Sequence, residues 1–412
     1  MATDRIVPAQ LHPFARPAAE AASFVNIVSG HGATVTDDHG NDYVDALGSL
    51  WYCQIGHGRE EMAEAIAAQC RTLAGFHTFD RFANPPAEAL CAELVGMAPM
   101  DGARVFLTSG GSEAVESAIK LARMAQVRSG HSERTLIVSR RPSYHGVTYG
   151  AMSATGLPPN QEGWGALLPD MVQVDRDDLD KLDALLAEEG SRLAAIIAEP
   201  VIGAAGVYPP APGYLAGLRE RCDRLGAYLI LDEVVCAFGR LGTWWAAEYF
   251  DVRPDLVTFA KGVTSGYQPV GGVLVGRAVR EPLEADPAFL LRHGNTYSGH
   301  PAGCAAGLAN LAIMRREGLL GRSVEVGAAL RSGLESLVDG SRVTEVRGAG
   351  AVWALGFGPG ADAVAVRNAM LARGVIARPI GPSTMAFCPP LVITDAEMDH
   401  LVSATGEAIV AC

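Results

Sequence analysis

The chain has 412 residues, of which 49% are apolar, and this apolar content excludes disorder and predicts a large folded unit or two closely associated domains. Its formal net charge at pH 7 is -13. The acidic balance leaves no basic face for a nucleic-acid backbone or an anionic membrane, so small molecules are the expected partners. No run of about 20 apolar residues would span a bilayer, and Met1 to Gln10 lacks the apolar segment of an export signal, so we expect a cytoplasmic protein.

The spacing of cysteine and histidine argues against a metal site. Eight cysteines lie far apart, without the C-x-x-C pairs of zinc and redox sites, and the histidines include no H-E-x-x-H motif. We therefore expect reduced cysteines and no bound metal. Lysine is rare: of the 33 lysines and arginines, only three are lysines, namely Lys120, Lys181 and Lys261. A lysine that lies beside an apolar segment of such a chain calls for an explanation.

Short apolar runs alternate with amphipathic stretches from about residue 104 to residue 310. This pattern is typical of strand–helix–strand units and predicts an α/β fold, with a mostly parallel sheet flanked by helices. A helix is predicted over Ser112–Ala125, because its apolar residues recur at helical spacing and its charged residues lie on other faces. The predicted strands are Arg104–Leu107, Leu193–Ala198, Ala227–Leu231 and Leu256–Ala260.

The pattern changes after residue 310 to that of a smaller α+β region. Two helices are predicted, over Pro301–Arg316 and Val324–Val338, followed by strands at Val343–Val346 and Val352–Phe357. No internal repeat or low-complexity tract interrupts the chain. We therefore expect no free hinge.

The segment Thr108–Glu113 lies between a predicted strand and a predicted helix and contains Gly110, Gly111 and Ser112. The glycines allow a sharp turn and a close approach to a ligand, and the N-terminus of the helix offers free N–H groups to an anion. The segment suits a phosphate. A serine after a glycine turn is also an ordinary start of a helix, so this segment alone leaves both interpretations open.

Asp232 follows the apolar strand predicted at Ala227–Leu231. Because an unpaired buried carboxylate is costly, Asp232 implies a cation near the end of this strand. The Mg²⁺ of a nucleoside triphosphatase is one candidate, but the chain has no G-x-x-x-x-G-K-[ST] loop. A protonated pyridine ring is the other.

Lys261 follows the apolar strand predicted at Leu256–Ala260. Partial desolvation lowers the pKa of an ammonium group, and the neutral amine is the form that condenses with an aldehyde. The pattern therefore favours a lysine that forms a Schiff base. The alternative, for this residue alone, is a lysine whose stem packs at the strand end while its charge reaches solvent.

Tyr144 lies beside His145 in a loop between predicted strands and offers an aromatic face to a planar cofactor, although tyrosines more commonly belong to the surface or the core. Together, the four segments supply an anion cradle, a carboxylate for a ring nitrogen, an amine for an aldehyde and a stacking face. Pyridoxal phosphate requires these groups. A non-catalytic protein that holds a different phosphate or a nucleotide is the alternative from another class.

The run from Leu231 to Gly242, followed 29 residues after Asp232 by Lys261, resembles the signature of the class-III pyridoxal-phosphate-dependent aminotransferases. The resemblance extends over nearly the whole chain. It implies fold type I, with a large cofactor-binding domain at 56–309 and a small α+β domain formed from both termini, 1–55 and 310–412. Cys236 and Ala237 stand where the signature frequently has threonine and glycine, which affects the local shape of the pocket and not the assignment.

By this resemblance, Asp232 would hold the pyridinium nitrogen and Lys261 would carry the cofactor as a Schiff base. Val234 and Tyr144 would pack on opposite faces of the ring, and Glu199 would lie in the layer behind the aspartate. The other residues implied in cofactor binding are Gly110, Gly111, Ser112, His145 and Thr296. The threonine would reach the phosphate of the neighbouring subunit, which implies a homodimer with shared active sites, either alone or paired into a tetramer.

The segment 261–269 looks most like the branch of the family that transfers amino groups from ω-amino acids or primary amines to pyruvate. Val235 agrees with this branch, because the branches that act on ornithine, acetylornithine or 4-aminobutyrate commonly have glutamine at the position of this valine. Leu50 and Trp51 resemble the wall of the amine pocket. Arg378 resembles the arginine that pairs with a substrate carboxylate, and an exposed loop arginine is the alternative for this residue.

The expected activity is a ping-pong transamination. Lys261 would move the substrate proton, and Asp232 would stabilise the cationic ring that takes up electrons from the substrate carbon. The nearest alternative is an aminomutase or decarboxylase on the same fold, which would share the cofactor residues and differ in the pocket. A requirement for a keto acid separates the two.

Overall fold

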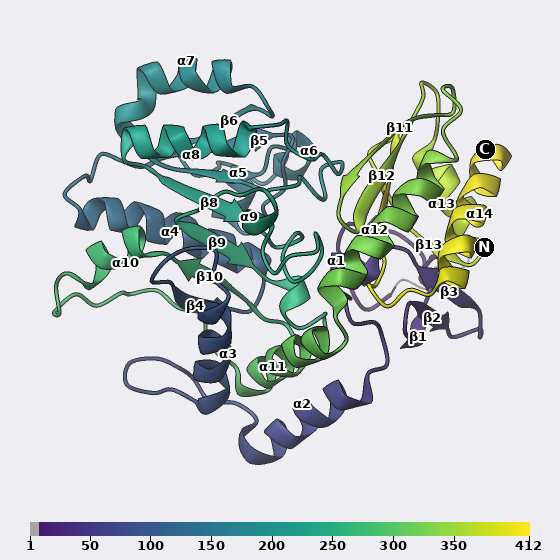
Figure 1. The fold of residues 1–412 in the computed structure, drawn as a ribbon, viewed down its shortest axis with the longest axis horizontal. Helices are drawn as coiled ribbons and strands as arrows, with labels where there is room; N and C mark the ends of the chain where they lie inside the picture. Colours follow the sequence, from purple (N-terminus) through teal and green to yellow (C-terminus); the bar gives the residue numbers. More distant parts are fainter. Residues whose placement is uncertain (1–7) are drawn as a thin grey trace, which may run out of the picture.

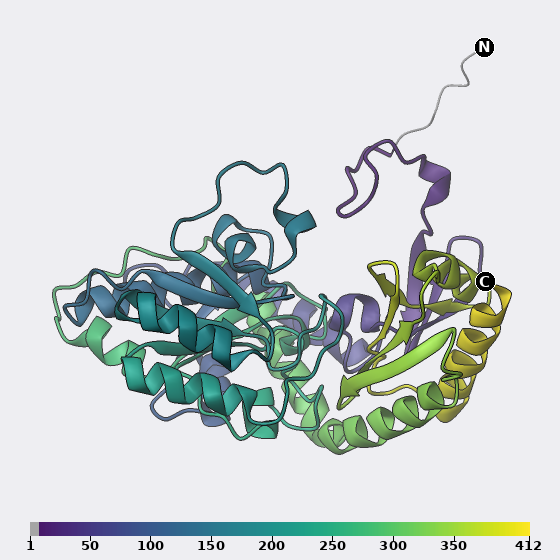
Figure 2. The same cartoon turned by 90° about the horizontal axis from the view of Figure 1, so that it is seen from above.

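The computed structural model describes residues 8–412, so the first seven residues of the predicted small domain lie outside it. Figure 1 shows two bodies: a large sheet with its helices, and a smaller body in which α12, α13 and α14 lie beside two small sheets. In Figure 2 the segment before the first strand arches above the region between the two bodies. No helix among the described residues is long and apolar enough to cross a membrane.

The large body is built on a seven-stranded sheet. Its strands run parallel to their neighbours except β10, which is antiparallel to the strands on both sides of it. The strands, in spatial order, are β4 (Arg104–Thr108), β10 (Gly271–Val275), β9 (Leu256–Phe259), β8 (Tyr228–Asp232), β7 (Leu193–Ala198), β5 (Leu136–Arg141) and β6 (Met171–Asp175). This arrangement confirms the predicted mostly parallel sheet.

Helices cover both faces of this sheet. In β8, Leu229 and Leu231 belong to the core that includes residues of α8 (Tyr214–Leu225), whereas Ile230 belongs to the core that includes residues of α4 (Gly111–Arg128). Successive side chains of a strand point to opposite faces, so a strand buried on both sides needs an unbroken apolar run. The apolar runs of the sequence have this origin.

The remaining helices of the large body connect the strands or lie below them in Figure 1. They are α2 (Glu60–Leu73), α3 (Pro85–Gly96), α5 (Tyr149–Ala154), α6 (Pro158–Gln161), α7 (Leu179–Glu189), α9 (Ala246–Tyr249), α10 (Arg277–Glu284) and the single turns η2 (Gly190–Arg192) and η3 (Lys261–Val263). Helix α11 (Pro301–Arg316) packs against α2 and α3. The predicted boundary between residues 309 and 310 falls inside this helix.

Two four-stranded sheets form the smaller body. The first pairs a strand from the N-terminal part of the chain, β3, in parallel with a strand from the C-terminal part, β13. The second is antiparallel throughout. Their strands are β1 (Ile27–His31), β2 (Thr34–Asp37), β3 (Asp42–Asp45) and β13 (Val375–Ile376), then β11 (Val343–Ala349), β12 (Val352–Phe357), β15 (Thr384–Phe387) and β14 (Arg378–Ile380). The exact domain limits remain predictions.

The helices of this body are α12 (Leu319–Glu335), α13 (Ala363–Leu371) and α14 (Asp395–Ala411), and two short helical turns, η1 (Ala21–Ser23) and α1 (Gly48–Trp51), lie in the N-terminal part. The predicted limits of β7, β12 and α11 are confirmed. Helix α12 begins five residues earlier than predicted, directly after Gly318, because the left-handed backbone of this glycine (φ 62°) separates it from α11. Strand β8 extends one residue further and ends on Asp232.

Candidate active site

A cavity of about 530 Å³ lies where the carboxyl ends of several strands of the large sheet approach residues of the smaller body. Such strand ends are the usual ligand sites of parallel sheets. The predicted site residues that line the cavity are Leu50, Trp51, Gly111, Ser112, Tyr144, His145, Glu199, Asp232, Val234, Val235, Lys261 and Arg378. Two others do not line it: Gly110 precedes α4 as its N-cap, and Thr296 is exposed in a turn.

Asp232 is buried at the end of β8 and is held on both carboxylate oxygens. Thr258 Oγ1 donates to its Oδ1 at 3.0 Å, the backbone N–H of Val234 donates to the same oxygen at 3.2 Å, and His145 Nδ1 lies 2.7 Å from Oδ2. A carboxylate accepts about four hydrogen bonds, so about one acceptor position remains. Asp232 also lines the cavity, and this position therefore suits a cationic N–H donor.

Lys261 follows β9 and begins the turn η3 with a left-handed backbone, φ 48°. This conformation costs a residue other than glycine about 1–2 kcal/mol. The Nζ amine forms no hydrogen bond or ion pair with the described residues. Burial lowers the pKa of Lys261, and the nearby charges of Asp232 and Glu199 act in the opposite direction. An unpaired amine with a lowered pKa is poised to react as a nucleophile.

The N-terminus of α4 forms an anion cradle at one end of the cavity. The first backbone N–H groups of a helix have no acceptor within the helix. In α4 these N–H groups belong to Gly111 and Ser112, which line the cavity. A β-carbon on Gly111 would lie 2.9 Å from Val234 Cγ1, so only glycine allows this valine to pack so closely. Gly146, at φ 129°, lets the next loop approach the helix, because a β-carbon there would lie 2.9 Å from the Ser112 Cα.

Glu199 ties the loop of Tyr144 to the end of β7. Its carboxylate accepts hydrogen bonds from the backbone N–H groups of Tyr144 and Gly203, each at 2.9 Å. Burial raises the pKa of Glu199, which the nearby His145 counteracts. The glutamate directly follows β7, whose last residue Ala198 pairs with Leu231 of β8, and its anchoring role fixes where the tyrosine ring enters the cavity.

Leu50 and Trp51 form a wall of the cavity from an irregular segment of α1. Ser49 and Trp51 have left-handed backbones, φ 58° and 68°. The buried carboxylate of Asp45 holds this segment, since it accepts from the backbone N–H of Leu47 at 3.2 Å and from that of Ser49 at 2.5 Å. The wall is therefore fixed by the end of β3.

Arg378 begins β14 and is half-buried, so it is not the exposed loop arginine of the alternative interpretation. Burial lowers the pKa of its guanidinium, and Tyr144 acts in the opposite direction. The guanidinium forms no ion pair or hydrogen bond within residues 8–412. An unpaired arginine in a cavity is available for a carboxylate, which it binds with two parallel hydrogen bonds.

The sequence reasoning missed several residues of this site. Thr258 could have been found, because β8 and β9 are parallel neighbours and their register pairs Asp232 with this threonine, the one polar residue in its strand. The others come from loops or from the short elements α6 and β14, and no local pattern marks them. They are Phe14, Gly146, Leu157, Pro159, Asn160, Ala204, Pro379, Ile380 and Gly381.

This set of groups fits pyridoxal phosphate. The free acceptor position of Asp232 suits a protonated ring nitrogen, the unpaired Lys261 amine suits the aldehyde, and the free amides of α4 suit the phosphate. The planar ring would lie between Tyr144 and Val234, which both line the cavity. The ring nitrogen, the aldehyde, the phosphate and the ring faces of the cofactor thus each have a partner of the right chemistry.

Comparison with known proteins agrees with this fit. Residues 15–409 match the aminotransferase class-III family. A probable aminotransferase of Mycobacterium tuberculosis is 42% identical over 342 residues, covering 79% of this chain and 73% of that protein. The β-alanine–pyruvate aminotransferase of Pseudomonas aeruginosa is 35% identical over 410 residues, covering 93% of this chain and 91% of that protein.

A solved structure gives the same result. The amine transaminase from an uncultivated Pseudomonas species, in its PLP-bound form, matches with a TM-score of 0.93 at 36% identity, covering 98% of this chain and 99% of that one. Fold type I, the catalytic class and the cofactor predicted from the sequence are thereby confirmed. The chain belongs to the class-III aminotransferases, enzymes that transfer amino groups with pyridoxal phosphate as cofactor.

Proposed function

We propose that this chain transfers amino groups from ω-amino acids or primary amines to pyruvate, as a cytoplasmic homodimer. The observation that carries the substrate assignment is the unpaired guanidinium of Arg378, in one cavity with the apolar side chains of Leu50, Trp51 and Val235. A carboxylate pairs with the guanidinium, whereas the uncharged substituent of an amine packs on the apolar wall. The similarity to a β-alanine–pyruvate aminotransferase supports pyruvate as the acceptor.

In the proposed mechanism, bound pyridoxal phosphate supplies an aldehyde that condenses with amines and a ring that accepts electrons from the substrate carbon. Lys261 Nζ takes the proton from the substrate carbon that bears the amino group, because this amine lines the cavity, has no partner among the described residues and has a lowered pKa. Asp232 keeps the ring nitrogen protonated. Arg378 orients the keto acid in the second half reaction, in which Lys261 delivers a proton to the carbonyl carbon of the keto acid, the carbon that receives the amino group.

The dimer proposal concerns Thr296. This threonine is exposed in the turn after His293, outside the cavity of its own chain, and the adjacent Tyr297 is 68% exposed. An exposed polar residue beside a large exposed aromatic ring suits a surface that a second copy covers. In the proposed dimer, Thr296 of each copy reaches the phosphate in the other copy.

The function is tested by separating the two half reactions. The enzyme loaded with pyridoxal phosphate is mixed with a primary amine or with β-alanine in a single turnover, and the cofactor absorbance is followed. It is then returned to its starting form with pyruvate. We expect bleaching by the amine, recovery on addition of pyruvate and formation of alanine. Formation of more than one equivalent of product per active site without any keto acid would instead identify an aminomutase or decarboxylase.

A further inference from the structure

The turn that carries Lys261 is strained at two positions. Lys261 and Ser265 both have left-handed backbones, φ 48° and 49°, within five residues of one another. Residues other than glycine keep such conformations only when their surroundings hold them there. Strand β9 fixes the start of this turn, so another element must hold its far side.

Asn310, on α11, is the residue that holds it. Its side chain is fully buried. The Nδ2 group donates to the backbone carbonyls of Gly262 and Val263, at 2.9 and 3.0 Å, and these two residues directly follow Lys261. An amide nitrogen has two hydrogens, and each of these carbonyls takes one. Without this donor, the buried Val263 carbonyl would lose its side-chain partner, at a cost in free energy.

Ser265 fixes the orientation of this amide. Its hydroxyl accepts from the backbone N–H of Ile55 at 3.3 Å and donates to Asn310 Oδ1 at 2.7 Å. If the amide were flipped, the Asn310 oxygen would face the carbonyl oxygens of Gly262 and Val263, and all three are hydrogen-bond acceptors. The serine and the asparagine therefore act as one unit.

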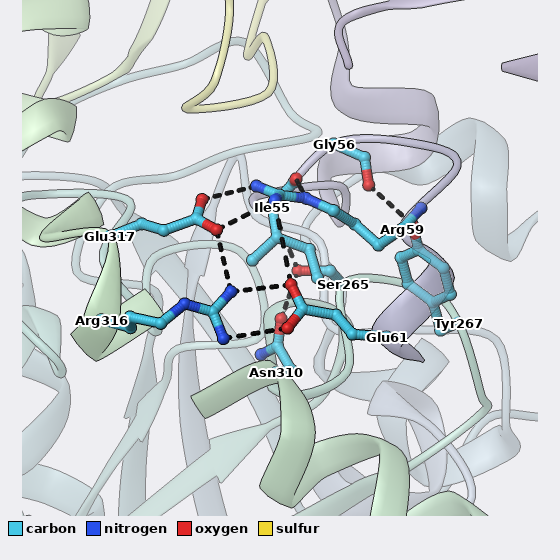
Figure 3. Close-up of polar contacts among 9 residues, drawn as sticks. All are labelled: Ile55, Gly56, Arg59, Glu61, Ser265, Tyr267, Asn310, Arg316 and Glu317. Atoms are coloured by element: carbon cyan, nitrogen blue, oxygen red, sulfur yellow. Dashed lines mark hydrogen bonds and ion pairs between the residues drawn. The ribbon is translucent and has the colours of Figure 1, made fainter. Parts of the chain in front are cut away.

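Figure 3 shows that this unit lies within a wider network between α11, the segment before α2 and the loop after Lys261. Tyr267 Oη donates to the Gly56 carbonyl at 2.9 Å and accepts from the Arg59 N–H at 2.8 Å. Arg59 pairs with Glu317 at the end of α11. The outer part of the network also holds an exposed ion pair between Arg316 and Glu61.

We propose that Asn310, oriented by Ser265, is a positioning residue that aims the Lys261 amine into the cavity by holding the left-handed turn. This role rests on the proposed function of Lys261. Neither residue lines the cavity, so both act through the backbone of the turn. The exposed ion pair between Arg316 of α11 and Glu61 of α2 forms no hydrogen bond or ion pair with the described residues of the turn.

The test compares three variants of the holoenzyme. Asn310→Asp keeps the shape of the side chain but replaces the donor by oxygens that repel both carbonyls. Ser265→Ala is a milder change that removes only the hydroxyl. Arg316→Gln is the matched control, because it breaks a polar contact of α11 in the exposed part of the network. The measurements are the pH titration of the visible absorbance of the cofactor–lysine linkage, the single-turnover rate with an amine and the apparent KM for pyruvate.

We expect Asn310→Asp and Ser265→Ala to move the midpoint of the absorbance titration by about half a pH unit or more and to slow the amine half reaction about tenfold or more. The KM for pyruvate, which depends on Arg378, should stay within about twofold of wild type. Arg316→Gln should change none of these quantities.

A purely structural role predicts a different result. Variants that melt at a lower temperature but keep the wild-type titration midpoint and single-turnover rate would overturn the proposal. If Asn310→Asp does not fold, Ser265→Ala decides alone by the same measurements. Failure of the proposed function is a separate observation, since it would appear in the wild-type enzyme, as an amine that does not bleach the cofactor absorbance or as pyruvate that does not restore it.

Discussion

Replacing Arg378 by alanine should weaken pyruvate binding and leave the binding of an uncharged amine unchanged. The guanidinium is half-buried, lines the cavity and has no other partner among the described residues, so its removal strands no protein carboxylate. Its contact with a substrate carboxylate is charge-assisted and worth about 1.5–3 kcal/mol. This free energy corresponds to about a ten- to hundredfold rise in the apparent KM for pyruvate.

The assay follows each half reaction separately by single-turnover absorbance, with 1-phenylethylamine as the uncharged donor. The donor reaction should stay within about twofold of wild type, because Trp51 and Tyr144 remain in place. Arg378→Lys should give an intermediate loss, since an ammonium keeps the charge but not the planar pair of donors. Arg342→Ala, at an exposed position, is the control. Equal losses in both half reactions would refute the reasoning and assign Arg378 to the fold or the dimer.

Three further predictions concern the cofactor. Lys261→Ala should keep the fold but lose the visible lysine linkage and nearly all turnover. The control is Lys181→Ala, which removes an exposed lysine paired with Asp175 and should behave as wild type. Substantial transamination by Lys261→Ala would end the proposed mechanism. Asp232→Asn should weaken retention of pyridoxal phosphate and slow proton transfer about tenfold or more, because a neutral amide holds a protonated ring less well. A cofactor titration and a single-turnover rate measure the two effects. Wild-type values in both would make Asp232 a purely structural acid. Burial lowers the pKa of Lys261, and the neutral amine is the form that captures pyridoxal phosphate. The rate of capture by the apoprotein should therefore rise with pH and reach its plateau at a pH below the ordinary lysine pKa of about 10.4. A stopped-flow pH profile centred at or above that value would contradict this inference.

The cofactor side of the site could be predicted from the sequence because its signals are local. Asp232 and Lys261 each lie at the end of an apolar strand, and Ser112 lies at the start of an amphipathic helix. Parallel strands bring such ends to one edge of the sheet, so chain order alone places these residues together. The limits of β7 and α11 followed from the apolar pattern for the same reason.

The substrate side depends on contacts between distant parts of the chain. Phe14 lies before the first strand, Asn160 within the short helix α6 and Gly381 after β14, and no periodic pattern links them. Asn310 looks in the sequence like an ordinary polar residue within an apolar helix. Its role becomes visible only when α11 is placed against the turn after Lys261. Tertiary packing, and not local propensity, decides these positions.

The parallel pairing of β3 with β13 has a consequence for the newly synthesised protein. Val44 is among the early residues to leave the ribosome, and its partner Val375 is among the late ones. Domains generally fold as units during synthesis, but this sheet must wait for nearly the whole chain. The wall formed by Leu50 and Trp51, which Asp45 of β3 holds, therefore lacks this strand pairing until β13 has been synthesised. The strands of the large sheet that carry Asp232 and precede Lys261 are thus synthesised before the sheet that supports the substrate wall can be completed.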